Sequence, residues 1–80
     1  MKIYWNGKSK NIIGERVKAL RTQNKLTQEG LAVKLQLEGH QFSDLTILRI
    51  ESGKRFVPDY EVKILAKFFN VSCDYLLGDN

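Results

Sequence analysis

Apolar residues recur at helical spacing along most of this chain. Two stripes are complete: the first is Ile13, Val17 and Leu20, and the second is Val62, Leu65, Ala66 and Phe69. Spacings of three and four residues place such side chains on one face of a helix. The pattern therefore predicts one helix that begins with Asn11 as its cap and ends near Asn24, and another that opens at Pro58 and Asp59.

Two further helices are indicated by their N-terminal signals. Thr27 and Ser43 are residues that cap helices, and each lies between two apolar residues at the spacing of a hydrophobic staple. These signals predict helices over residues 26–35 and 43–52, and Gly53 suits the left-handed position that ends the second. The residues expected to face inward are Leu31, Ala32 and Leu35 from the first helix and Ile47 and Ile50 from the second.

A fifth, short helix is predicted from Val71-Ser72 to Leu77-Gly78, and no segment favours a strand. The fold class is therefore expected to be all-α. A chain of 80 residues with 42% hydrophobic content allows one small domain, which buries only about 60% of its unfolded surface. We expect an N-terminal arm over residues 1–10, one domain over 11–78 and a tail at 79–80, with any function on the surface.

The positive charge flanks the centre of the chain. The formal net charge is +4 and the pI is about 9.4, which permits a polyanionic partner. Residues 1–25 carry seven Lys or Arg and one Glu, whereas residues 26–51 carry two Lys or Arg against four Asp or Glu. Cations near the central pair of helices are supplied by Lys18 and Lys25 before it and by Lys54 and Arg55 at its end.

Several functional classes find no support in the composition. Cys73 is the only cysteine, so no intramolecular disulfide can form, which fits a reducing cytoplasm. We find no signal peptide, and no apolar run approaches the roughly 20 residues of a membrane span. His40 lacks the partners of a metal site, and no nucleophile motif or phosphate loop occurs. We therefore expect no enzyme, cofactor, metal or small-molecule ligand.

The central pair of short helices, followed by a glycine and two cations, is typical of a helix-turn-helix motif. In that motif the second helix lies in the major groove with its N-terminal residues at base edges. The exposed residues expected to contact bases are Asp44, Leu45 and Arg49, with Thr46 near the DNA backbone. Arginine can bond guanine, leucine can pack on a thymine methyl group and aspartate can accept from cytosine. Helix capping is the alternative role of Asp44.

From Ile12 to Gly78 the chain resembles the phage repressor and Cro-like (XRE-type) helix-turn-helix regulators. The segments that carry the resemblance are IGERVKALR, LTQEGLA, LTILRIESGKR, PDYEVKILAKFF and NVSCDYLLG, in the expected order. The resemblance implies a compact five-helix lambda-repressor-like DNA-binding domain, usually presented to operators by a homodimer.

The resemblance also implies roles for individual residues. Gln28 would bond a phosphate or a neighbouring base-contacting residue, and Thr27 matches the family as well. Lys54 and Arg55 would contact the DNA backbone after the recognition helix. Arg21 and Glu51 match a pair that forms an internal salt bridge.

The connection between the two motif helices departs from the family pattern. A joint of three or four residues is usual, whereas seven residues, 36–42, precede the Ser43 cap. The longer connection could widen the angle between the helices, or it could bulge and leave both in place. We expect a bulge in which Leu37 and Phe42 cover Leu48, an apolar residue at a usually polar position.

Two functions compete. The leading hypothesis is a sequence-specific transcriptional regulator, in particular a repressor, that binds double-stranded operator DNA as a homodimer with half-sites about one helical turn apart. The alternative is a protein-interaction module, such as an antitoxin or adaptor, that uses Leu45, Leu48 and the longer connection as an apolar contact. The N-terminal arm, and the fifth helix with Tyr75 and Leu76, are the two candidate dimer surfaces.

Overall fold

Five α-helices form between residues 9 and 78, the part of the chain that the computed structural model describes. They are α1 (Gly14–Gln23), α2 (Gln28–Leu37), α3 (Asp44–Glu51), α4 (Asp59–Phe69) and α5 (Cys73–Leu77). No strand occurs in this range. The predicted all-α, five-helix architecture is confirmed. The arm, apart from its last two residues, and the tail lie outside the described residues.

Side-chain caps fix where three of the helices begin. The hydroxyl groups of Thr27, Ser43 and Ser72 accept hydrogen bonds from the backbone N–H three residues later, at 2.9, 3.1 and 3.0 Å. The predicted cap of α1, Asn11, instead lies two residues before the observed N-cap, Ile13, and its Oδ1 accepts a hydrogen bond from the N–H of Gly14 at 2.9 Å. Each such cap contributes about 1 kcal/mol to stability, and the predicted caps Thr27 and Ser43 are confirmed.

One hydrophobic core joins all five helices and the connection between α2 and α3. Its buried side chains are Ile13, Val17, Leu20, Leu31, Ala32, Leu35, Phe42, Ile47, Ile50, Val62, Leu65, Ala66 and Leu76. The predicted stripes are confirmed, except that Phe69 is only half-buried. Leu76 is 0% exposed, so the expectation that it forms a dimer surface is wrong; it is needed inside its own domain.

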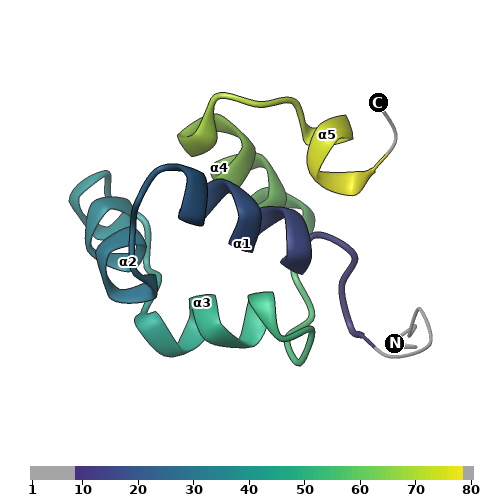
Figure 1. Cartoon of the computed structure of the whole chain (residues 1–80), viewed down its shortest axis with the longest axis horizontal. Coiled ribbons are helices and arrows are strands. Elements are labelled where there is room, and N and C mark those ends of the chain that lie inside the picture. The colour runs from purple at the N-terminus through teal and green to yellow at the C-terminus, as the bar shows by residue number, and fades with distance from the viewer. Residues whose placement is uncertain (1–8, 79–80) are drawn as a thin grey trace.

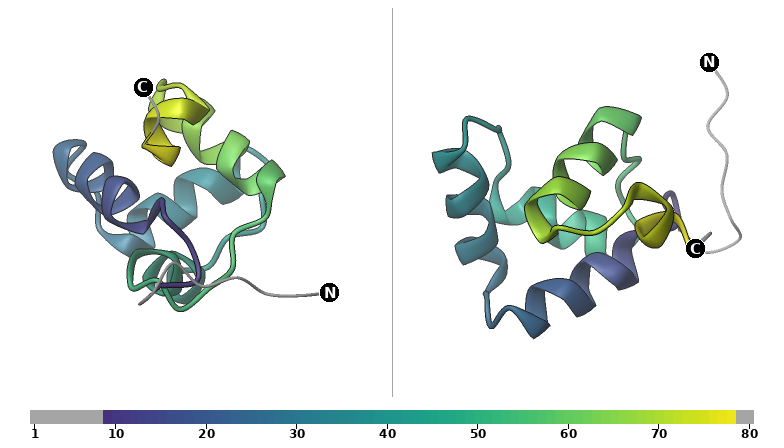
Figure 2. Two further views of the ribbon diagram at one scale, coloured as in Figure 1. Left: turned by 90° about the vertical axis from the view of Figure 1, so that its right-hand side faces the viewer. Right: turned by 90° about the horizontal axis from the view of Figure 1, so that it is seen from above.

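Helix α3 lies along one edge of the molecule. In Figure 1 it runs along the bottom of the view, with α1 above it and α2 at one end, while α4 and α5 lie on the far side of α1. The left view of Figure 2, which is turned by 90° about the vertical axis, agrees, since no other helix lies below α3 there either. One long side of α3 is therefore left without a covering helix.

The connection between α2 and α3 is shorter than expected. Helix α2 continues through Gln36 and Leu37, two residues beyond the predicted end. Residues 38–42 alone therefore separate its last residue from the Ser43 cap. Gly39 has a φ of +92°, a left-handed conformation that glycine adopts without strain and that ends the helix.

The predicted cover for Leu48 does not form. Phe42 is 3% exposed and belongs to the main core, whereas Leu37 is 82% exposed. Because α2 continues through position 37, Leu37 projects from the outer face of that helix, four residues after the exposed Val33. Leu48 is 45% exposed, so the interpretation of Leu37 as its partner is wrong.

Candidate nucleic-acid interface

Helix α3 presents a ridge of three side chains to solvent. Ile47 and Ile50 are 0% exposed and point into the core. At about 100° of rotation per residue, Leu45 points directly away from them, with Leu48 and Arg49 on either side of it. All three are exposed, and the guanidinium group of Arg49 makes no hydrogen bond with another residue in the described part of the chain. These side chains are free to meet a ligand.

The first turn of α3 is held by polar side chains. The Oδ1 atom of Asp44 accepts a hydrogen bond from the N–H of Leu45 at 2.9 Å, so Asp44 contributes to the helix start. The hydroxyl groups of Ser43 and Thr46 lie 3.0 Å apart and share one hydrogen bond. Asp44 is also exposed, so its structural role and a contact with a ligand can coexist.

An ion pair ties α1 to the end of α3. Nε of Arg21 donates to Oε2 of Glu51 at 2.6 Å, and Nη2 donates to Oε1 at 3.0 Å. The two side chains are 14% and 4% exposed. The hydrogen bond to Glu51 raises the pKa of Arg21 above its ordinary value, with the carboxylate charge adding to this effect and burial opposing it. The salt bridge that the resemblance implied is present in the structure.

The beginning of α2 joins the same network. Nε2 of Gln28 donates to Oε1 of Glu51 at 3.1 Å, so a single carboxylate links α1, α2 and α3. Gln28 thus has an internal partner in Glu51, and the contact with a phosphate or a base-contacting residue that the resemblance implied stays a prediction. Thr27 is exposed beside it. Its oxygen accepts the capping bond, which leaves the hydroxyl proton available as a donor.

The turn after α3 carries two cations in different situations. Gly53 has a φ of +77°, as expected for the residue that ends the helix. Lys54 is exposed, and no described carboxylate pairs with it. Arg55 instead forms an ion pair with Glu61 of α4, with Nη2 donating to Oε2 at 3.1 Å. Because Glu61 is 7% exposed, Arg55 neutralises a buried carboxylate.

Comparison with known proteins shows which family the chain belongs to. A family model described as a helix-turn-helix domain matches residues 14–78. The chain belongs to this helix-turn-helix family. The crystal structure of the DNA-binding domain of BldD matches with a TM-score of 0.74 and 24% identity, over 92% of this chain and 99% of that chain. At 24% identity, this match shows that the two domains share a fold. No curated protein sequence matches the chain.

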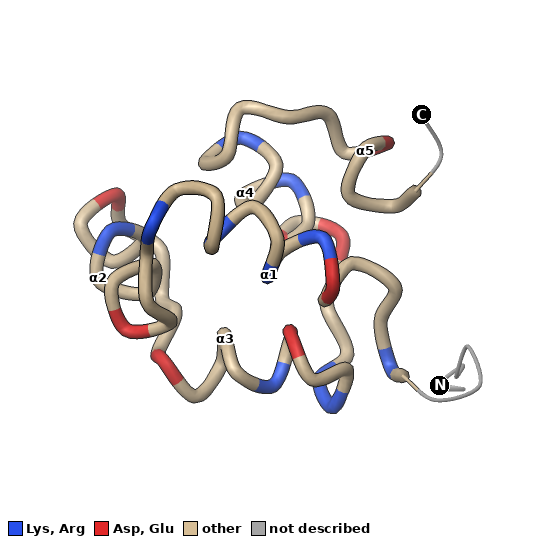
Figure 3. The backbone as a smooth tube through the Cα atoms, in the orientation of Figure 1, with Lys and Arg blue, Asp and Glu red and all other residues tan. Residues whose placement is uncertain are grey.

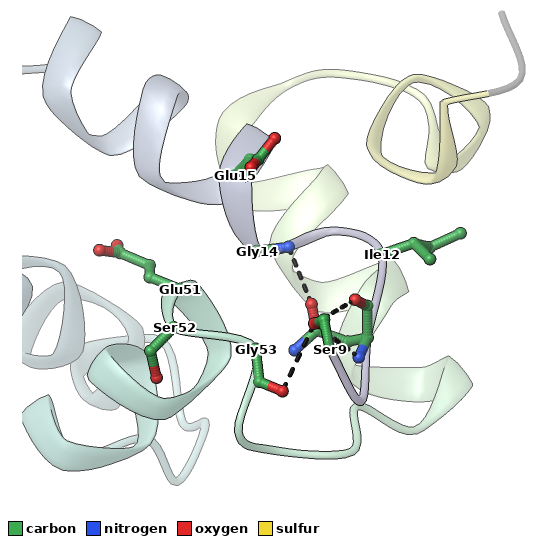
Figure 4. A pocket seen from close by; sticks show the side chains of 8 residues that line it. Ser9, Ile12, Gly14, Glu15, Glu51, Ser52 and Gly53 are labelled. Carbon is green, nitrogen blue, oxygen red and sulfur yellow. Dashed lines mark hydrogen bonds between the residues drawn. The ribbon is translucent and has the colours of Figure 1, made fainter. Parts of the chain in front are cut away.

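Asn11 holds the far end of α3 within the helix-turn-helix domain. Its Nδ2 donates to the carbonyl oxygens of Ile50 at 3.1 Å and Arg55 at 2.9 Å, while its Oδ1 accepts from the N–H of Gly14. The backbone N–H of Lys10 also donates to the carbonyl of Gly53 at 2.7 Å. The chain entering α1 is thus fastened to the turn that carries Lys54. Figure 4 shows this region, where Ser9 lies against Gly53.

Gly14 lets α1 approach α3 closely in the same region. A Cβ atom at this position would lie 2.3 Å from the carbonyl oxygen of Ile50 and 3.2 Å from that of Glu51. Only glycine fits there without movement of one helix. The sequence offered no signal for this contact or for the bonds of Asn11 to α3, because the partners lie about 40 residues away along the chain.

Charge is distributed unevenly along the candidate interface. Figure 3 shows acidic residues at both ends of α3, and cations toward its C-terminal end and in the turn that follows; the C-terminal acid, Glu51, is buried in its ion pair with Arg21. Lys18 and Lys25 on the α1 side are exposed. Arg16 is not part of this set, because its guanidinium group stacks over the ring of Tyr75, 4.9 Å from the centroid. It supports the packing of α5 on α1.

We looked between residues 9 and 78 for features of other functional classes, namely a metal site, a reactive thiol and a membrane-spanning helix. No group of three or more His, Cys, Asp or Glu side chains is placed to hold a metal ion in that range. Cys73 is a half-buried free thiol. None of the described helices is long and apolar enough to cross a membrane. The exposed side of α3 and its flanking cations are the candidate nucleic-acid interface.

Proposed function

We propose that this domain binds double-stranded DNA sequence-specifically and regulates transcription, with α3 in the major groove. The observation that carries the proposal is the uncovered ridge of Leu45, Leu48 and Arg49, on the helix that a helix-turn-helix domain presents to base edges. The matched structure of BldD is that of a DNA-binding domain, which supports the same use of this fold.

The proposed contacts divide into base edges and phosphates. Arg49 would bond a guanine, Leu45 would meet a thymine methyl group, and Asp44 would accept from a cytosine amino group. Thr27 at the start of α2, Thr46 in the first turn of α3 and Lys54 after α3 would donate to phosphates. Gln28 and Arg55 have internal carboxylate partners, so they would reach a phosphate only with their remaining N–H donors.

We further propose that the protein acts as a repressor and binds as a homodimer. Two copies related by a twofold axis would place their α3 helices in successive major grooves, about one helical turn apart. A repressor of this kind works by occupying its operator. The mass of the complex, measured with one duplex at several protein concentrations, tests this: a single copy on a palindromic duplex at saturation contradicts the dimer.

The affinity for DNA should fall steeply with salt. A duplex enriched from a random pool is titrated at about 50 to 200 mM salt, where each neutralised phosphate contributes about −0.9 to the slope of log affinity against log salt. Lys54, together with the exposed Lys18 of α1 and Lys25 after that helix, predicts a slope of several such contributions. A flat response, or a pool from which no sequence is enriched, contradicts the proposal.

Replacing Arg49 and replacing Lys54 should have different effects. Arg49→Ala should cost about 1–3 kcal/mol on the enriched duplex and relax the preference at one base pair. Lys54→Ala should weaken all sequences by a similar factor and reduce the salt slope by about one. Lys63→Ala is the matched control, because Lys63 is exposed on α4, away from the uncovered side of α3. Equal base preferences in all three variants would contradict these roles.

A protein-interaction module is a second candidate function. The observation that favours it is the exposed apolar pair on α2, Val33 at 45% and Leu37 at 82% exposure. This pair lies on another helix than the proposed base contacts, so the two functions are separable. The double variant Val33→Ser, Leu37→Ser should bind DNA as the wild type does. Loss of a protein partner in that variant alone would establish the second function.

A further inference from the structure

Two leucines lie on the uncovered side of α3. Leu45 is 47% exposed and Leu48 is 45% exposed. They are three residues apart, so they are neighbours on the helix surface with Cβ atoms about 5–6 Å apart. Apolar surface of this kind stays in contact with water unless a ligand covers it.

No other part of the described chain covers them. Leu37, the residue expected to pack on Leu48, is 82% exposed and projects from α2. Phe42, the other expected partner, is 3% exposed and is built into the core. Leu48 is therefore as accessible to a ligand as Leu45, although the sequence had suggested a supporting role for it.

The surroundings of the two leucines favour DNA over a protein as the ligand. A stable protein interface buries about 1,200–2,000 Å² in total, which two half-exposed leucines do not approach. Arg49 lies directly beside them, and Lys54 follows at the end of the helix, both exposed. A narrow apolar strip with cations beside it complements a groove whose floor carries methyl groups and whose edges carry phosphates.

The chemistry of the groove then limits which bases fit. The C5-methyl group of thymine is the apolar group that a major-groove edge presents. A leucine pressed against guanine, adenine or cytosine would displace water from polar atoms without replacing their hydrogen bonds, which costs free energy. Successive base pairs rise by about 3.4 Å, so side chains about 5–6 Å apart span one to two base-pair steps.

We infer that Leu45 and Leu48 together recognise two thymine methyl groups on base pairs one or two steps apart, on either strand. The inference rests on the proposed DNA binding and goes beyond it, because it names the operator class: a half-site with two closely spaced thymines beside the guanine of Arg49. Leu48 thereby becomes a specificity-determining residue. Since Arg49 lies on the other side of Leu45, its guanine contact does not compete with Leu48.

Deoxyuridine tests this without changing the protein, because it is thymidine without the methyl group. In the duplex enriched from a random pool, each thymidine of the half-site is replaced in turn by deoxyuridine, and affinity is measured at one salt concentration. Two replacements should each weaken binding about fourfold, as expected when one methyl group is no longer removed from water. The remaining replacements should have no effect.

The variants assign each methyl group to a leucine. In Leu48→Ala, one of the two sensitive thymidines should become indifferent to deoxyuridine, and in Leu45→Ala the other should. Both residues are exposed, so the fold should tolerate the changes. Leu37→Ala is the matched control, because it removes the same atoms from an exposed leucine on α2 and should keep both sensitivities.

The possible failures are distinguishable. A duplex that binds with a steep salt dependence but tolerates deoxyuridine everywhere overturns the inference and leaves the proposed DNA binding standing. Sensitivity that persists in Leu48→Ala overturns the role of Leu48. A pool that yields no enriched sequence overturns both, and capture of a protein through Leu45 and Leu48 in its place would identify the alternative ligand.

Discussion

Gly14→Ala should destabilise the domain by about 2–3 kcal/mol. The new Cβ would lie 2.3 Å from the backbone carbonyl oxygen of Ile50, which cannot rotate away as a side chain could. Overpacking of this kind typically costs 1–3 kcal/mol. For a domain of this size, a loss of 2–3 kcal/mol lowers the melting temperature by roughly 10–20 °C. Thermal and urea unfolding followed by circular dichroism measure the change.

The direction of the stability change in Gly14→Ala distinguishes a close helix contact from simple helix propensity. In an exposed helix, replacing glycine by alanine stabilises by about 1 kcal/mol, so helix propensity alone predicts the opposite result. Gly30→Ala is the control. Near Gly30 the new Cβ would meet only the Thr27 hydroxyl at 3.1 Å and a Leu26 methyl at 3.7 Å, so we expect a change within about 1 kcal/mol. Gly14→Ala with wild-type stability would contradict the close approach of α1 and α3.

The contact at Gly14 bears on the proposed function because α1 supports the last turn of α3. A shift of α1 away from Ile50 would also disturb the bonds from Asn11 to the carbonyls of Ile50 and Arg55. Those bonds hold the turn that carries Lys54. Residual folded Gly14→Ala protein should therefore bind the enriched duplex less tightly than wild type at a temperature where both are folded.

Much of the fold was predictable because its signals are local. A capping side chain accepts a hydrogen bond from the backbone N–H three residues later, and the apolar residues of a core stripe recur every three or four residues. Both signals can therefore be recognised within about ten residues of sequence. Thr27, Ser43 and the stripe of Ile13, Val17 and Leu20 illustrate this. The helix limits followed with an error of at most two or three residues.

The end of α2 shows where such signals were misjudged. A helix that ends at Leu35 would leave Leu37 in the connection, where it could pack on Leu48; α2 instead ends at Leu37. Gly39 was the available signal, because a left-handed glycine commonly follows the last turn of a helix. Placing it there carries α2 through Leu37 and turns that side chain outward. The error in one helix limit thus produced the error about Leu48.

The candidate site was less predictable, because its geometry depends on residues far apart in the chain. The outward direction of Leu45 and Arg49 followed from the periodicity of α3. In contrast, the partners of Asn11 and Gly14 lie on α3 and its following turn, about 40 residues away along the chain. No local pattern reports such contacts, so their roles required the structure.

Arg21→Ala should destabilise the domain by about 3 kcal/mol. Glu51 is 4% exposed, and removal of one partner from a buried ion pair leaves an uncompensated charge at a cost of roughly 3–5 kcal/mol. We expect the lower end, because Gln28 still donates to Glu51 at 3.1 Å. The carbonyl of Leu26 also loses its bond from Nη1 of Arg21, which is 2.8 Å long. Urea unfolding at constant salt measures the loss.

The protonation state of Arg21 should not complicate this measurement. Its folded pKa is raised by the hydrogen bond to Glu51, so the contribution of its charge is fully present below the ordinary pKa of arginine and is lost only above it. The wild-type advantage over Arg21→Ala should therefore be the same at pH 7 and pH 9. An advantage that disappears over this interval would show that Arg21 is not the group responsible.

A double variant separates stability from orientation. Buried ion pairs replaced by apolar residues of similar volume are often neutral or even stabilising, so Arg21→Met combined with Glu51→Leu should be more stable than Arg21→Ala. It nevertheless removes the carboxylate that links α1, α3 and Gln28 at the start of α2. If that link sets the angle between the motif helices, the double variant should be stably folded yet bind the enriched duplex more weakly than wild type. Equal affinity would mean that core packing alone holds α3 in position, and that the ion pair serves only to neutralise its own buried charge.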